Sequence, residues 1–273
     1  MKRRSCGVKI KKYTRATLNL NTTTLIKIIF CALNEAQNLK NFLVNLGYEM
    51  QILQRDFEII VCLDGSSDES LQILSDFQKS LPIKILPLKN ERGLGLAFKR
   101  LFLEALSSSA NEDDLVISLD ADNTHDPEQI STMLSHFESN SLDLLVSSRF
   151  CNKSVIEDFP LHRKFISKVT SILLQKLFAV KKISGENLQD FTSGYRIYRV
   201  KKLRELFDTQ KNKFISEPEF TYTCELLIKL ARINSRIDEI EISYDYGKKI
   251  GKSKLRILRN FFRLMVLLKQ LAR

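Results

Sequence analysis

The sequence predicts an α/β fold in which a mostly parallel sheet is flanked by helices. Short β-rich apolar runs alternate along the chain with helical patterns of about 10 to 15 residues, an order typical of parallel sheets. Hydrophobic residues make up 44% of the 273-residue chain, which is enough for a sizeable core. The charged fraction of 27% is ordinary for a globular protein, so disorder is not expected over most of the chain.

The elements follow one another from residue 25 onwards. Strands are predicted at residues 25–33, 57–63, 83–88, 115–119, 142–148 and 237–244. Helices are predicted at residues 35–46, from the 64–68 loop to about residue 79, at 93–106, from Pro127, and at 161–180 and 220–230. Proline is common at the first position of a helix, which supports the start at Pro127. Residues 190–199 are expected to form a polar, glycine-containing segment.

Three regions are predicted along the chain. Residues 1–24 form a basic N-terminal tail, residues 25–245 form one domain with halves 25–150 and 151–245, and residues 246–273 form a basic loop and an amphipathic helix. The net charge is +11, and neither residues 1–15 nor residues 248–273 contain an acid. Such basic ends favour polyanions, which include nucleic acid, phosphorylated small molecules and anionic membrane surfaces.

The C-terminal helix is basic and amphipathic. Its apolar side carries Ile257, Leu258, Phe261, Leu264, Met265, Leu268 and Leu271, and its other side carries Arg256, Arg259, Arg263 and Arg273. A helix of this kind can lie on an anionic membrane, and it can equally dock on its own domain or on a partner. The sequence leaves these alternatives open.

Cysteine usage indicates a reduced compartment. The chain has five cysteines, an odd number, and their spacing matches no metal-ligand pattern. A cytoplasmic location is therefore expected, with a peripheral position on the cytoplasmic membrane face left open. The three histidines have no nearby cysteine, which argues against zinc. No transmembrane helix is expected, because no window approaches 18 uninterrupted apolar residues.

Polar loops follow directly on three of the predicted strands. They contain Asn34 with Glu35, Asp64 with Gly65, and the segment formed by Asp120, Ala121 and Asp122. Ligands of such sheets bind beyond the carboxyl ends of the strands. We therefore expect these three loops to converge on one edge of the sheet.

Asp120 and Asp122 are the strongest candidates for chemistry. Two carboxylates alone would repel a nucleoside diphosphate, but a bridging Mg²⁺ or Mn²⁺ reverses the local charge. Such an ion also stabilises the diphosphate as it leaves. The alternative is a solvated loop with acidic helix-capping residues before Pro127. The other strand-end loops favour the metal site.

Two further loops are candidates for nucleotide contacts. Asp64 and Gly65 can hydrogen-bond a base or ribose, although the same residues make an ordinary turn and helix cap. Gly93 and Gly95 can let the backbone approach a phosphate or sugar closely. Neither Gly-x-Gly-x-x-Gly nor a Walker motif is present.

Together these residues resemble glycosyltransferase family 2, and within it the dolichol-phosphate mannose synthase-like group. The resemblance rests on residues 32–35 (ALNE), 63–66 (LDGS), 92–95 (RGLG), 120–122 (DAD), 148–150 (SRF), 190–196 (DFTSGYR) and 251–255 (GKSKL). These motifs run in family order, and their order and spacing together make the match specific.

The resemblance implies a GT-A fold, a nucleoside-diphosphate sugar donor, a divalent metal and inversion at the anomeric carbon. Asn34, Glu35 and Asp64 would hold the nucleoside, and Asp120 and Asp122 would hold the metal and diphosphate. The remaining donor contacts would come from Gly65, Gly93, Gly95 and Ala121. The acceptor of such synthases is a polyprenyl phosphate, and the residues expected to hold its phosphate are Arg149, Arg163, Ser167, Arg196 and Lys248.

The acceptor determines whether a general base is needed. A phosphate is already ionised near neutral pH, whereas a hydroxyl must lose its proton to a carboxylate. Asp190 is the first candidate for this base, ahead of Glu217 and Glu219, because it lies in a matched motif. The alternative is that Asp190 caps a helix or binds a backbone amide.

Three positions depart from the family pattern. Ala32 replaces a proline, Leu63 replaces an acid that often contacts the base, and Lys248 replaces an arginine, which changes a bidentate phosphate contact into a point charge. GDP-mannose is the favoured donor, with UDP-glucose and a UDP-N-acetylhexosamine as alternatives.

Three other functions are weighed against a polyprenyl-phosphate sugar synthase. A family 2 enzyme acting on a hydroxyl of a glycan, lipid or small molecule remains open. A nucleotidyltransferase is disfavoured because the first strand is not followed by a glycine-rich, lysine-containing loop. Nucleic acid is not expected as a partner, since no recognised nucleic-acid motif accompanies the basic charge.

Overall fold

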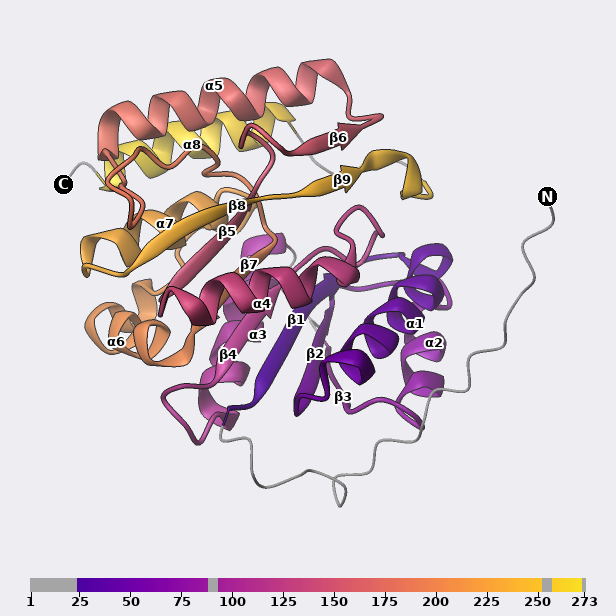
Figure 1. Ribbon diagram of the computed structural model, residues 1–273. Coiled ribbons are helices and arrows are strands. Elements are labelled where there is room, and N and C mark those ends of the chain that lie inside the picture. The colour runs from indigo at the N-terminus through magenta and orange to yellow at the C-terminus, as the bar shows by residue number, and fades with distance from the viewer. Residues whose placement is uncertain (1–23, 88–92, 252–256, 272–273) are drawn as a thin grey trace.

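A seven-stranded mixed sheet forms the centre of the protein, as a computed structural model shows (Figure 1). The structure describes residues 24–87, 93–251 and 257–271. The strand order is β3-β2-β1-β4-β7-β5-β8. The strands are β1 (Ile26–Ala32), β2 (Phe57–Leu63), β3 (Ile83–Pro87), β4 (Leu115–Ser118), β5 (Leu144–Ser148), β7 (Arg196–Arg199) and β8 (Ile237–Glu241). The neighbouring pairs are parallel except where β7 lies antiparallel to β4 and β5, so the predicted α/β class is confirmed.

Helices cover both faces of the sheet (Figure 1). One face packs against α1 (Ala36–Leu53), α2 (Ser70–Phe77) and α4 (Ile130–Ser139), which follows the short η2 (Pro127–Gln129). The other face packs against α3 (Leu94–Ser108), α6 (Val200–Gln210), α7 (Tyr222–Arg232) and α8 (Ile257–Leu271). Strand β1 shows why both faces are covered: Ile28 and Phe30 join the first core, and Ile29 joins the second. Burial on both faces is typical of parallel strands.

The segment at residues 190–199 differs from its predicted form. Its last four residues form β7, between β4 and β5. The two arginines of β7 interrupt its apolar pattern, but Arg196 is completely buried and donates to the carbonyls of Phe191 (2.9 Å) and Thr223 (2.7 Å). The hydrogen bonds of the guanidinium therefore allow a charged residue inside a central strand.

Two other boundaries differ from the sequence prediction. Helix α1 continues through Gly47 to Leu53 instead of ending at residue 46, because Gly47 is buried on its packed face. The predicted strand at 237–244 is divided into β8 and β9 (Ser243–Asp245), and β9 pairs with β6 (Val155–Glu157) in a separate two-stranded sheet. This small sheet lies beyond the carboxyl end of β5 and β8.

Helix α8 packs on the domain and lies beside α5 (Leu161–Phe178) (Figure 1). Leu264, Leu267 and Leu271 are buried in the core. Phe262 is 68% exposed, and Met265, which the sequence placed on the apolar side, is 43% exposed. The helix therefore docks through one side and keeps large apolar residues at the surface on another. None of the helices in the described ranges is long and apolar enough to cross a bilayer.

Gly95 lies in the first turn of α3, where its backbone meets the segment before α7. Its amide donates to the carbonyl of Pro218 at 2.9 Å. A Cβ at this position would lie 2.0 Å from the carbonyl oxygen of Glu217. A methyl group cannot fit there without moving backbone.

We expect Gly95→Ala to lower the free energy of unfolding by about 2–3 kcal/mol, because it overpacks a backbone contact. Urea unfolding followed by circular dichroism measures this loss. Gly194→Ala is the matched control, because no atom lies within 4 Å of its added Cβ, and it should change the free energy by less than about 0.5 kcal/mol. Equal effects of the two substitutions would contradict the packing role of Gly95.

Candidate active site

The loops after β1 and β2 are joined at the carboxyl edge of the sheet. The amide of Asn34 donates to Oγ of Ser66 (3.0 Å), and Oδ1 of Asn34 accepts from the amide of Ser67 (2.8 Å). Oδ2 of Asp68 accepts a hydrogen bond from the amide of Ala36 at 2.9 Å. This bond satisfies one of the N–H groups at the start of α1 that have no partner within the helix. Two loops that are about 30 residues apart in sequence therefore form one surface.

A polar pocket of about 460 Å³ opens beside this surface. Its lining is formed by Asn34, Glu35, Ala36, Gln37, Asn38, Asp68, Glu69, Ile250 and Gly251. Pockets for small ligands commonly have a volume of about 300 to 1,000 Å³. The pocket combines carboxylates and amides, which are the groups that hydrogen-bond a base or a ribose. Asp64 lies at the adjacent strand end and is 6% exposed.

The acidic pair follows β4 at the same edge. The side chain of Asp120 is 37% exposed, and that of Asp122 is 12% exposed. Oδ1 of Asp122 accepts from the amide (3.2 Å) and the hydroxyl (2.6 Å) of Thr124. Its other oxygen, Oδ2, lies 2.5 Å from Nζ of Lys249. Although burial alone would raise the pKa of Asp122, the Lys249 ammonium holds it below its usual range.

His125, which was not predicted as a site residue, fixes the backbone of the acidic pair. Its Nδ1 accepts from the amide of Asp120 at 2.9 Å, and its ring lies 5.0 Å from that of Tyr195. Burial lowers the pKa of His125, in spite of the opposing carboxylate of Asp120. A neutral ring that accepts at Nδ1 carries its hydrogen on Nε2. Its position three residues after Asp122 is the sequence feature that could have pointed to it.

Asp120 and Asp122 fit a divalent metal site of the kind that the substrate completes. Carboxylate oxygens suit Mg²⁺ and Mn²⁺. Within the part of the chain that the structure describes, no group of three or more His, Cys, Asp or Glu residues could hold a metal. The protein would therefore supply two carboxylates, and phosphate oxygens or water would supply the remaining ligands.

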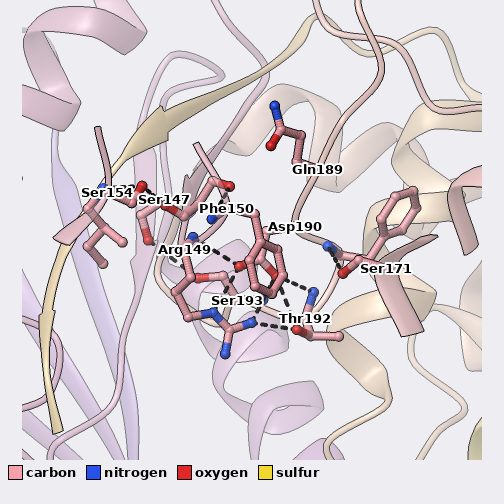
Figure 2. A network of polar contacts seen from close by, with 12 residues as sticks. Ser147, Arg149, Phe150, Ser154, Ser171, Gln189, Asp190, Thr192 and Ser193 are labelled. Atoms are coloured by element: carbon pink, nitrogen blue, oxygen red, sulfur yellow. Dashed lines mark hydrogen bonds and ion pairs between the residues drawn. The ribbon is translucent and has the colours of Figure 1, made fainter. Parts of the chain in front are cut away.

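Asp190 and Arg149 form a buried ion pair on the other side of the site (Figure 2). Oδ2 of Asp190 accepts from Nε of Arg149 (2.8 Å) and from its amide (3.1 Å), and Oδ1 accepts from Nη2 (2.9 Å). The amides of Thr192 and Ser193 also donate to Oδ1. Burial alone would raise the pKa of Asp190, but Arg149 and these donors lower it to about 2.

These contacts correct the prediction that Asp190 is a general base. Its carboxylate is completely buried and its oxygens are already bonded, and a pKa of about 2 makes it a poor proton acceptor near neutral pH. Asp190 instead binds backbone amides, the alternative that the sequence left open, and it positions Arg149.

An aromatic cluster connects the acidic pair to the predicted acceptor residues. The ring of Tyr244 lies 5.5 Å from His125 and 5.5 Å from Phe159. The guanidinium of Arg149 lies 5.9 Å from the centre of Phe159, and that of Arg163 lies 5.6 Å from it. The two arginines therefore share one aromatic ring, close to the acidic pair. Cation–π contacts of this kind hold guanidinium groups in place.

The other predicted acceptor residues lie in different surroundings. Ser167 lines a pocket with Arg163 between α5, α7 and α8. Nζ of Lys248 lies 2.8 Å from Oδ2 of Asp126. Arg196 is completely buried and bonded to two carbonyls, which corrects its assignment to the phosphate site.

Gly93 and Gly95, at the start of α3, approach another segment of the protein closely. Added Cβ atoms at Gly93 and Gly95 would meet the backbone of residues 217–219. The amide of Gly95 is bonded to Pro218, so it is not available to a phosphate. The close approach that these glycines permit is within the protein.

Comparisons with known proteins agree with this arrangement. The model of the family described as Glycosyl transferase family 2 matches residues 27–207, about two thirds of the chain. The chain belongs to glycosyltransferase family 2. The matched range begins in β1, includes the acidic pair and the Arg149–Asp190 pair, and ends in α6.

The related sequences narrow the group within family 2. A dolichol-phosphate mannosyltransferase of Pyrococcus furiosus is 28% identical over 88% of this chain and 63% of its own length. An undecaprenyl-phosphate mannosyltransferase of Micrococcus luteus is 28% identical over 63% of this chain and 65% of its own length. The matches thus span less than two thirds of these two relatives. They confirm the resemblance that the motifs predicted.

Solved structures confirm the predicted GT-A fold. Glucosyl-3-phosphoglycerate synthase from Mycobacterium tuberculosis, in complex with Mn²⁺, UDP and glucosyl-3-phosphoglycerate, matches with a TM-score of 0.61 at 15% identity. That match covers 90% of this chain and 79% of the other. TarS of S. aureus matches with a TM-score of 0.52 at 17% identity, over 90% of this chain and 64% of the other.

The Arg149–Asp190 pair predicts a pH-dependent stability. The pKa of Asp190 falls from its usual 3.8 to about 2 on folding, so its stabilisation is complete above about pH 4 and is lost as the pH falls through 2. We expect Asp190→Asn to lower the free energy of unfolding by about 3–5 kcal/mol at pH 6. The difference in the free energy of unfolding between the wild type and Asp190→Asn should narrow by about 2 kcal/mol as the pH falls from 5 to 2.

Urea unfolding at a series of pH values measures this gap. Asp208→Asn is the matched control, because Asp208 is a surface residue with a 63% exposed side chain. Its effect should stay below about 0.5 kcal/mol at each pH. A gap for Asp190→Asn that does not change with pH would contradict the ion pair.

Proposed function

We propose that this family 2 protein transfers mannose from GDP-mannose to a polyprenyl phosphate, with inversion at the anomeric carbon. The observation that carries the proposal is the use of Asp190 to orient Arg149, a cation on the acceptor side, instead of as a base. A phosphate acceptor needs cations and no strong base, whereas a hydroxyl needs a base. The Pyrococcus furiosus and Micrococcus luteus relatives are named as mannosyltransferases of dolichol phosphate and undecaprenyl phosphate, which supports the same choice.

The donor would occupy the carboxyl edge of β1, β2 and β4. The pocket lined by Asn34, Glu35 and Asp68 suits the nucleoside. Asp64 and Gly65, which follow β2 at the adjacent strand end, would add further contacts. The diphosphate would then reach the acidic pair. A UDP-sugar is the alternative donor. Position 63, where the family often has an acid that contacts the nucleobase, is a buried leucine here and offers no such contact.

Asp120 and Asp122 would hold Mg²⁺ or Mn²⁺ together with the diphosphate. When bound, the ion supplies positive charge that stabilises the leaving diphosphate. Nδ1 of His125 accepts a hydrogen bond from the Asp120 amide and so fixes the backbone, and the hydroxyl of Thr124 orients Oδ1 of Asp122. The loop geometry is therefore set by groups that do not themselves bind the ion.

On the acceptor side, Arg149, Arg163 and Ser167 would bind the lipid phosphate, and Lys248 would add charge at the rim. Asp190 and Thr192 hold Nε and Nη2 of Arg149, so the guanidinium has a fixed direction before the acceptor arrives. A phosphate oxygen attacks the anomeric carbon from the face opposite the leaving group. The bond between that carbon and the β-phosphate oxygen breaks, and GDP departs with the bonding electrons.

The surface formed by α5 and α8 would contact the membrane that contains this acceptor. Leu161 (82%), Phe165 (70%), Leu177 (55%) and Phe262 (68%) are large apolar residues exposed on it. Neither helix contains an acid, and α5 carries Arg163, Lys164, Lys168 and Lys176. Apolar side chains interleaved with basic ones match an anionic bilayer. We therefore propose that the protein binds the cytoplasmic face of a membrane.

The first test is transfer of labelled sugar into the organic phase. Purified protein is incubated with a polyprenyl phosphate, Mn²⁺ or Mg²⁺, and labelled GDP-mannose, UDP-glucose or UDP-N-acetylglucosamine. We expect metal-dependent lipid labelling from GDP-mannose, and a loss of about 100-fold or more in Asp122→Ala because a group that stabilises the leaving diphosphate is removed.

Asp208→Ala, on the outer surface of α6, should retain wild-type transfer. Lipid labelling from a UDP-sugar instead would keep the lipid acceptor and change the donor. Slow donor hydrolysis without lipid label would shift the acceptor to a hydroxyl compound. If the protein shows neither turnover nor nucleotide binding, the enzyme assignment is overturned.

The membrane contact is tested by vesicle flotation. We expect the double substitution Leu161→Ser with Phe165→Ser to weaken binding to phosphatidylglycerol-containing vesicles about tenfold or more, since it removes two apolar side chains from the contact. Ile52→Ser with Leu71→Ser is the matched control, because these residues are 58% and 53% exposed on α1 and α2. Equal binding by all three proteins would contradict the α5–α8 surface.

A further inference from the structure

Lys249 places a positive charge on the acidic pair from within the chain. Its Nζ lies 2.5 Å from Oδ2 of Asp122, and the two side chains are only 13% and 12% exposed. Burial alone would lower the pKa of Lys249, but Asp122, Asp120 and Glu35 raise it. The ammonium therefore lies in the negative field of three carboxylates, two of which are the metal-binding candidates.

The residues around Lys249 are held to both sides of the site. The amide of Ile250 donates to Oδ1 of Asn38 at 3.1 Å, and Nδ2 of Asn38 donates to the carbonyl of Ile250 at 3.1 Å. At the other end, the hydroxyl of Tyr246 accepts from Nη1 of Arg163 at 2.6 Å. Residues 246–251 thus form a strap from the acceptor side to the rim of the donor pocket, with Lys249 near its middle.

An ammonium ion and a divalent cation cannot both bind the same oxygen of Asp122. Their like charges would repel at contact distance in a site with little solvent. Without either cation, Asp122 would be a buried carboxylate without a neutralising charge, which is unfavourable. The two cations are therefore alternatives for one position, and binding of one opposes binding of the other.

We propose that Lys249 is an internal counter-ion of the acidic pair, which a divalent cation displaces, so that metal binding releases the strap from Asn38. The inference rests on the proposed metal use of Asp120 and Asp122. Its consequence is a link between the two substrates. The strap lines the donor pocket with Ile250 and contacts Arg163 with Tyr246, so the arrival of metal and donor changes the acceptor side.

The test measures Mn²⁺ binding to the full chain without donor, from the loss of the electron paramagnetic resonance signal of free Mn²⁺. Lys249→Met removes the charge while keeping a long side chain. We expect it to bind Mn²⁺ about tenfold more tightly than the wild type, since the competing cation is gone. Lys248→Met is the matched control on the neighbouring residue, which pairs with Asp126, and it should change the affinity by less than about threefold.

A second readout follows the strap itself. Amide hydrogen exchange of residues 246–251 in the wild type should become faster when Mn²⁺ is added, because the Ile250 amide loses its bond to Asn38. Asn38→Ala, which loosens the strap and leaves Lys249 in place, should also tighten Mn²⁺ binding. This variant keeps the test decisive if Lys249→Met does not fold.

The outcomes separate this inference from the proposed function. If the wild type binds Mn²⁺ through Asp122 and Lys249→Met binds it no more tightly, the competition is overturned and the metal site stands. If neither protein binds Mn²⁺, either alone or with GDP added to complete the site, both the inference and the proposed metal use are wrong. Tighter binding by Lys249→Met that disappears when Asp122→Ala is added supports both.

Discussion

Charge pairing at the carboxyl edge of the sheet determines how the rest of the site is built. A charge without a partner in such a poorly solvated region costs several kcal/mol. Asp190 is paired with Arg149, Asp122 with Lys249, and Asp126 with Lys248. Each pair joins two segments that are far apart in sequence, so the three pairs also fix the positions of the loops that carry them. The strap and the loop after β5 are thereby held in a common arrangement.

The antiparallel strand β7 explains why Asp190 lies at this edge. Ligand-binding residues of a parallel sheet follow their strands, whereas Asp190 precedes β7. Because β7 runs opposite to β4 and β5, its beginning lies where β5 ends. Arg149 follows β5 directly, and so it meets Asp190. The buried guanidinium of Arg196 anchors the start of this strand by bonding to the carbonyl of Phe191.

The fold alone does not choose the acceptor. The solved structures that share it have only 15% and 17% identity to this chain, so they show the fold and not the substrate. The choice depends on the surroundings of Arg149 and Arg163. There the ring of Phe159 contacts both guanidinium groups, and the carboxylate of Asp190 is paired with Arg149 and is not available as a base. Helix α5, which contains Arg163, also exposes large apolar residues, as the proposed lipid acceptor would require.

The sequence by itself determined the α/β class, the parallel strands at the acidic loops and the family. These follow from local information: apolar runs that must be buried, polar residues at strand ends, and motifs in a fixed order. It did not determine the role of Asp190, the burial of Arg196, or the position of Lys249 on Asp122. These depend on which distant side chain lies opposite a charge, and spacing along the chain carries no such information. For the same reason, only the tertiary structure could show that α8 docks through Leu264 and Leu267 while it still exposes Phe262.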